Sequence, residues 1–170
     1  MSIRKNRSGQ TGQALVEFTW IMLLLIVMAF GLIDFGRFIY QRMVLVNVTR
    51  EGANLAARAT SMTNAMVSVI NSSQPLDINA RGRVIMTSVL NTGGVCRITA
   101  QVSQGGITAT SRIGTGVGNI ATLPSTPTPI PQMDQTLFVS EVFYTFTPIT
   151  PIGQLLGFAL PSQIYDVAYF

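Results

Sequence analysis

The chain has 170 residues, of which 48% are hydrophobic and 11% are charged, and its net charge is +4. Soluble domains usually carry about 25% charged residues, so we expect one membrane segment and one small domain. Histidine is absent and Cys96 is the one cysteine, which excludes an intramolecular disulfide and removes the commonest general base and metal ligand. The basic residues are scattered, so nucleic-acid binding is not expected.

The first part of the chain has the pattern of a membrane anchor behind a short leader. Residues 1–12 are polar and basic and contain no acidic residue, whereas the run from Ala14 to Ile33 is apolar except for Glu17. This run is long enough to cross the bilayer hydrocarbon, at roughly 30 Å as a helix. We expect a transmembrane helix over residues 13–34, with the N-terminus in the cytoplasm by the positive-inside rule. A secretory signal peptide is the alternative, but no small-residue cleavage site follows the run.

Glu17 needs an explanation because an ionisable side chain at the bilayer centre costs about 2–3 kcal/mol, and less near an end. One interpretation places it at the headgroup level without any further role. The other comes from its neighbours, since Gly12, Glu17 and Phe18 form the pattern Gly-x-x-x-x-Glu-Phe. This pattern resembles the processing site of type IVb prepilins and pseudopilins. The resemblance implies that a prepilin peptidase cleaves between Gly12 and Gln13, and that Glu17 then pairs with the α-amine of a neighbouring subunit.

The segment after the anchor is expected to continue the same helix. Apolar residues recur at helical spacing over residues 35–72, and no proline occurs before Pro75. A run of small residues that begins at Gly52 would let another helix or a sheet approach closely. Arg50 and Arg58 mark a polar face of this helix, which we expect to be solvated.

Two further elements on this helix resemble TadE-like pseudopilins of Tad pilus systems. Residues 34–37 read Asp-Phe-Gly-Arg and residues 50–53 read Arg-Glu-Gly-Ala, and both follow the processing pattern in the order typical of that family. The family motif residues are Asp34, Gly36, Arg37, Arg50, Glu51 and Gly52. The resemblance implies a pilin-like α+β fold, with one long N-terminal helix, half transmembrane and half soluble, followed by a small antiparallel sheet.

The same resemblance implies a function and a location. The chain would be a minor pilin or pseudopilin of the cell inner membrane, with one membrane pass, a cytoplasmic N-terminus and an extracytoplasmic C-terminal domain, and it could be incorporated in a surface pilus. Its partners would be the prepilin peptidase, other pilins or pseudopilins and the inner-membrane assembly platform, and it would need no cofactor. The alternative is an uncleaved, membrane-anchored binding module or assembly factor.

The C-terminal part, residues 73–170, is expected to form an extracytoplasmic antiparallel sheet of about three to four strands. Residues 83–90 and 95–102 alternate in the manner of a hairpin, and the two glycines between them suit its turn. A short helix over residues 81–90 is the alternative. Residues 123–132 contain four prolines and predict an extended connector.

The remaining strands are expected near the C-terminus. Residues 135–149 alternate with two largely apolar faces, which predicts a central strand covered by the helix on one side. Glu141 on this strand resembles a structural feature of the TadE-like family more than a catalyst. The apolar residues 152–160 are too few to span a membrane, so they would lie on the domain or on the bilayer surface. Residues 164–170 predict an edge strand that closes the sheet.

Catalysis is not expected from this sequence. The seven acidic residues are scattered, and no nucleophile–base pair or ligand cluster can be assembled from them. The segment Gly-Thr-Gly-Val-Gly-Asn at residues 114–119 lacks the lysine of a phosphate-binding loop. We therefore expect a structural protein that is not an enzyme.

Overall fold

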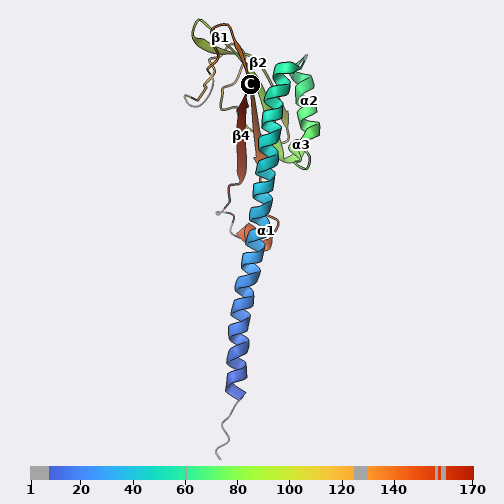
Figure 1. Cartoon of the computed structure of the whole chain (residues 1–170), viewed down its shortest axis with the longest axis vertical. Coiled ribbons are helices and arrows are strands. Elements are labelled where there is room, and N and C mark those ends of the chain that lie inside the picture. The colour runs from blue at the N-terminus through green and yellow to red at the C-terminus, as the bar shows by residue number, and fades with distance from the viewer. Residues whose placement is uncertain (1–7, 60, 125–129, 156, 158–159) are drawn as a thin grey trace, which may run out of the picture. The chain divides into compact units, whose positions relative to one another are not determined.

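The structure is a computed structural model that describes residues 8–59, 61–124, 130–155, 157 and 160–170. Its contacts divide the chain into two compact units. The first unit comprises residues 1–37 and 147–160, and the second comprises residues 38–146 and 161–170. Each unit is described by itself below, and helix α1, Ser8–Arg58, contributes residues to both (Figure 1).

In the first unit, α1 exposes apolar side chains on every side. All residues from Gly12 to Ala29 are exposed. The most apolar 18-residue window of the helix has a mean hydropathy of 2.4, yet none of it is buried. An apolar surface around the whole circumference is unfavourable in water and favourable in lipid. The helix is long and apolar enough to cross a bilayer, and it fits a single-pass membrane anchor, as the sequence predicts.

The helix does not continue unbroken to residue 72 as expected. It ends at Arg58, and a second helix, α2, follows over Met62–Ser72. Ser61 has an extended backbone and its side chain accepts a hydrogen bond from the backbone N–H of Asn64 at 3.2 Å. A serine in this position satisfies a free N–H at a helix start, so it favours a new helix where periodicity alone predicted continuation. The chain then passes Pro75 and forms α3, Ile78–Arg81.

The predicted sheet is present in the second unit and has four antiparallel strands. They are β1, Gly82–Thr92, β2, Val95–Gly105, β3, Thr136–Thr145, and β4, Gln163–Tyr169. Their order is β2-β1-β3-β4, so β3 is central and β4 is an edge strand, as predicted. The β1–β2 hairpin is also confirmed, and the alternative helix over residues 81–90 is wrong. Gly93 and Gly94 have φ values of 62° and 84° in its turn, which only glycine adopts without strain.

One face of β3 packs against the part of α1 that belongs to the second unit. Ser140 of β3 is fully buried, and a Cβ atom added to Gly52 would lie 2.5 Å from its Oγ. Further along, the Phe38 and Phe146 rings meet edge to face at 5.3 Å between centroids. The small residues predicted to permit a close approach therefore let this part of α1 lie directly on the sheet.

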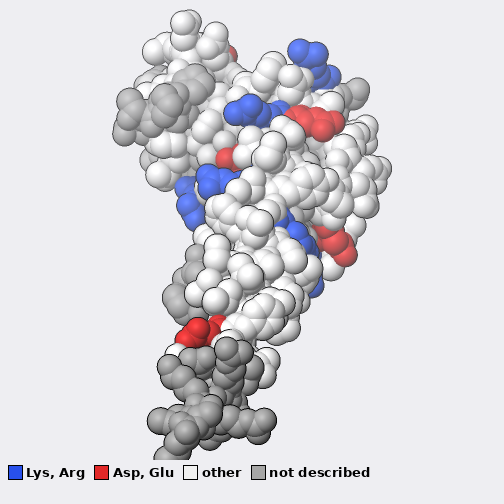
Figure 2. All heavy atoms as spheres, turned by 60° about the horizontal axis from the view of Figure 1, so that its bottom comes forward, with Lys and Arg blue, Asp and Glu red and all other residues white. Residues whose placement is uncertain are grey.

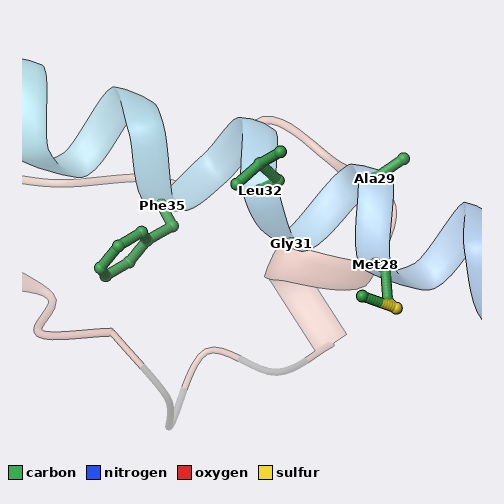
Figure 3. A pocket seen from close by; sticks show the side chains of 5 residues that line it. All are labelled: Met28, Ala29, Gly31, Leu32 and Phe35. Carbon is green, nitrogen blue, oxygen red and sulfur yellow. The ribbon is translucent and has the colours of Figure 1, made fainter.

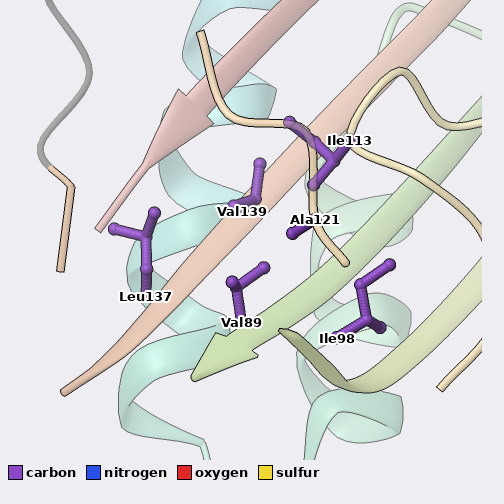
Figure 4. Close-up of a cluster of buried hydrophobic side chains, with 6 residues drawn as sticks. All are labelled: Val89, Ile98, Ile113, Ala121, Leu137 and Val139. Atoms are coloured by element: carbon purple, nitrogen blue, oxygen red, sulfur yellow. The ribbon is translucent and has the colours of Figure 1, made fainter. Parts of the chain in front are cut away.

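The other face of the sheet is covered by the loop that follows β2. Ile113 and Ala121 of this loop pack on side chains from three strands, as Figure 4 shows. The buried cluster contains Val89, Ile98, Ile113, Ala121, Leu137 and Val139. The glycine-rich residues 114–119 belong to this cover, since the Gly118 N–H donates to the Ile98 carbonyl at 2.7 Å. Cys96 is half-buried against the same cluster, in keeping with a small core residue.

Candidate functional site

The proposed processing residues lie near the start of α1. Gly12, Gln13, Glu17 and Phe18 are all exposed, and Phe18 retains 57% of its accessible surface. The Gln13 side-chain amide donates to Glu17 Oε1 at 3.0 Å. A Cβ atom added to Gly12 would meet nothing within 4 Å, so the described part of the chain gives no steric reason for glycine there.

Asp34 holds the segment after β3 against α1, within the first unit. Its carboxylate is 2% exposed and accepts hydrogen bonds from the Ile149 N–H at 3.0 Å, the Thr150 N–H at 3.4 Å and the Thr150 hydroxyl. Thr150 Oγ1 in turn accepts from the Gly153 N–H at 3.0 Å, at the start of α4, Pro151–Leu155. A Cβ atom at Gly153 would collide with Asp34 Oδ2. The first motif therefore contains a carboxylate that recognises a backbone segment far away in sequence.

The other residues of the first motif make fewer contacts. Gly36 is exposed, and a Cβ atom added there would meet nothing within 4 Å. Arg37 is half-buried, and its Nη1 atom has no hydrogen-bond partner among the described residues. No contact within the described chain therefore accounts for glycine at position 36.

The second motif is structural in the second unit. Glu51 Oε2 accepts a hydrogen bond from the Ser72 hydroxyl at 3.2 Å, which links α1 to the end of α2. Gly52 provides the close approach to Ser140. Arg50 is exposed, as predicted, but it also lines a hollow of about 450 Å³ together with Asn54 and the end of β4.

Glu141 is the centre of a buried hydrogen-bond network that the sequence did not predict. It is fully buried and accepts from the Arg112 backbone N–H at 2.8 Å, the Tyr165 hydroxyl at 3.0 Å and the Ser111 hydroxyl. The Arg112 guanidinium lies 3.8 Å from the centre of the Tyr165 ring, in the geometry of a cation–π contact. The carboxylate on β3 thus binds two donors of the covering loop and one of β4, and hydrogen bonds to a charged group are strong. This arrangement supports the structural interpretation of Glu141.

Tyr165 gives this network a pH dependence. Burial, followed by the negative charge of Glu141 and the hydrogen bond to it, raises the pKa of the Tyr165 phenol above its ordinary value of 10.0. The folded state thus holds the phenolic proton more tightly than the unfolded chain. The resulting stabilisation is complete below about pH 10 and is lost as the pH rises through the raised pKa. We expect Tyr165→Phe to be less stable than the wild type by about 1–1.5 kcal/mol at neutral pH.

The measurement is urea unfolding of the full chain in detergent micelles between neutral pH and about pH 11. The difference between the wild type and Tyr165→Phe should shrink at the alkaline end, because the variant has no phenol to titrate at this site. Tyr40→Phe is the matched control, since Tyr40 is 55% exposed, and it should leave the stability at neutral pH unchanged. An equal difference at all pH values would contradict the prediction.

The acidic side chains and Cys96 are not grouped to hold a metal ion in the part of the chain that the structure describes. No group of three or more histidine, cysteine or acidic side chains is placed to hold a metal ion there. On the face shown in Figure 2, basic and acidic side chains are dispersed among uncharged ones. The buried carboxylates of Asp34 and Glu141 accept hydrogen bonds from other segments of the chain.

These features define a pilin-like α+β protein, with one long N-terminal helix that begins in an apolar span and is followed in the sequence by a four-stranded antiparallel sheet. Residues 12–54 match the model of a family described as TadE-like protein. The match includes both motifs and the Gly12 to Phe18 pattern, and it confirms the resemblance found in the sequence. No curated protein and no solved structure matches the chain.

Proposed function

We propose that the chain is a minor pseudopilin that is processed after Gly12 and acts structurally in the assembly of a Tad pilus in the inner membrane. The observation that carries this proposal is the family match over residues 12–54, because it spans the cleavage pattern, the anchor and both motifs. The exposed apolar surface of α1 from Gly12 to Ala29 supports it, since such a surface can bury against lipid before assembly and against neighbouring helices afterwards.

Processing would occur near a helix end that opens easily. α1 begins at Ser8, so the bond between Gly12 and Gln13 lies close to the N-terminus, where helices fray at little cost. Co-expression with a prepilin peptidase should give a membrane-bound protein whose N-terminal sequence reads Gln-Ala-Leu-Val-Glu. Gly12→Phe should leave the chain at its full length, because a large side chain at this position obstructs the peptidase. A wild-type chain that still begins at Met1 beside an active peptidase would overturn the proposal.

Glu17 would act after cleavage. Its internal partner is the Gln13 side chain, and an exposed contact between residues four apart on a helix is worth only about 0.2–0.5 kcal/mol. A neighbour's α-amine at membrane depth offers a charged partner, which is more favourable than an amide. Glu17→Ala should therefore be cleaved normally but should reduce recovery of the protein with sheared pili about tenfold or more, as a loss of about 1.4 kcal/mol per contact predicts. Normal recovery of this variant would contradict the role of Glu17.

The second candidate function is an uncleaved membrane-anchored module that binds other pilus components. The bonds of Asp34 and Glu141 are compatible with it, since they stabilise the chain in either case. The N-terminal sequence of the membrane-bound protein separates the two candidates.

A further inference from the structure

The segment after β3 forms an uncharged surface beside the end of the apolar span. Residues 147–155 contain no charged side chain, yet Ile149 is 58% exposed and Leu155 is 83% exposed. An apolar side chain in water is unremarkable when it stands alone. Here, however, both belong to a segment that is fixed to α1 in the first unit, so their depth relative to the membrane is set by the helix.

Asp34 sets that depth. It follows directly after the apolar run that ends at Ile33, and it binds the backbone of Ile149 and Thr150. The first residues of α4 therefore lie beside the turn of α1 that leaves the hydrocarbon region. Gly153 completes the fit, because any larger residue there would collide with the Asp34 carboxylate.

The surface of α1 beside this attachment is also apolar. A shallow hollow of about 390 Å³ is lined by Met28, Ala29, Gly31, Leu32 and Phe35, and Figure 3 shows α4 beside this part of α1. Leu32 and Phe35 are 72% and 51% exposed. The apolar surface of the membrane span is thus continuous with the turn of α1 to which the segment is attached.

We propose that residues 147–155 are a second membrane contact, which rests in the interface between headgroups and acyl chains and is held there by Asp34. Ile149 and Leu155 insert into the outer part of the acyl region, as apolar side chains of interfacial segments do. Irregular backbone near lipid needs hydrogen-bond partners within the protein. Asp34 accepts from the Ile149 and Thr150 N–H groups, and Thr150 Oγ1 accepts from the Gly153 N–H. The proposal depends on the anchor alone and on neither processing nor pilus assembly.

The test uses tryptophan fluorescence of the full chain in vesicles of phosphatidylethanolamine and phosphatidylglycerol. Trp20 is the one tryptophan, so Trp20→Phe provides a dark background. Leu155→Trp is the reporter, and Val117→Trp is the matched control, because Val117 is 68% exposed in the loop of residues 114–119. Both substitutions replace an exposed side chain, so neither should disturb the fold.

We expect the reporter at residue 155 to emit at shorter wavelength than the control. It should lose about half of its emission to lipids brominated near the glycerol end of their acyl chains, as a segment buried by about 5–10 Å would, and the control should lose none. Equal exposure of both reporters to aqueous iodide would overturn the proposal. A blue-shifted reporter that resists the brominated lipid and depends on the protein-to-lipid ratio would also overturn it, because the surface would then face a second copy of the chain.

The tether is tested separately in the Leu155→Trp background. Asp34→Ala should return the brominated-lipid quenching to the level of the control, and Thr150→Val, which keeps the carboxylate and removes one donor, should reduce it in part. Glu51→Ala, an acidic-to-alanine change on the exposed face of the same helix, should leave it unchanged. Circular dichroism shows whether each variant is folded. Full quenching in folded Asp34→Ala would overturn the role of Asp34.

Discussion

Glu141→Ala should lower the free energy of unfolding of the second unit by about 2–4 kcal/mol, because hydrogen bonds to a charged group are worth about 1.5–3 kcal/mol each and part of this gain is offset by burial of the carboxylate. The change removes the carboxylate that accepts hydrogen bonds from the Ser111 hydroxyl, the Arg112 N–H and the Tyr165 hydroxyl. The loop that covers the cluster in Figure 4 and the edge strand β4 then lose the hydrogen bonds that both make to Glu141, while the backbone pairing of β3 with β4 remains.

The free energy can be followed by hydrogen exchange of the full chain in detergent micelles, since the slowest amides of β1 and β3 report global opening. Glu51→Ala is the matched control, because it removes an exposed carboxylate that accepts one hydrogen bond, from Ser72, and it should cost less than about 1 kcal/mol. Glu141→Gln retains the shape of the side chain and one acceptor oxygen. Its loss of unfolding free energy should therefore lie between those of Glu141→Ala and Glu51→Ala. A Glu141→Ala chain within about 0.5 kcal/mol of the wild type, the usual range of surface substitutions, would show that the network is not stabilising.

Gly52→Leu should have a comparable effect through packing. Even a Cβ atom at this position lies 2.5 Å from Ser140 Oγ and 3.2 Å from Ser140 Cβ, and the fully buried Ser140 has no open space to enter. Overpacking of this kind lowers the free energy of unfolding by about 1–3 kcal/mol or more. The better helix propensity of leucine offsets at most about 1 kcal/mol of this loss. We expect a net loss of about 2–3 kcal/mol, measured by the same exchange experiment.

The physical cause can be isolated with a smaller change and its partner. Ser140 Oγ is buried without a hydrogen-bond partner among the described residues, so Ser140→Ala should cost little. Gly52→Ala should destabilise the wild type but should be better tolerated when combined with Ser140→Ala, since the closest contact is then gone. Asn47→Leu on an exposed position of α1 should leave stability nearly unchanged. Additive effects of the Gly52 and Ser140 changes would contradict the steric explanation.

Elements that depend on local pattern could be predicted from the sequence. The apolar run that ends at Ile33, the two glycines of the hairpin turn and the alternation of β3 each lie in one continuous stretch of the chain, and the structure agrees with all three. The end of α1 at Arg58 was missed because hydrophobic periodicity continues across the break. The Ser61 cap that starts α2 is a local signal that could have located it.

The candidate site also combines features set by the local sequence with features set by the tertiary structure. The sequence by itself determined the long apolar helix, the order of the motifs and the family to which residues 12–54 are similar, because these depend on composition and on spacing along one helix. Only the tertiary structure decided what the carboxylates do. Asp34 meets Thr150, 116 residues away, and Glu141 meets Ser111, 30 residues away. A buried carboxylate must find donors wherever the fold brings them, and no spacing in the sequence encodes which distant segment supplies them.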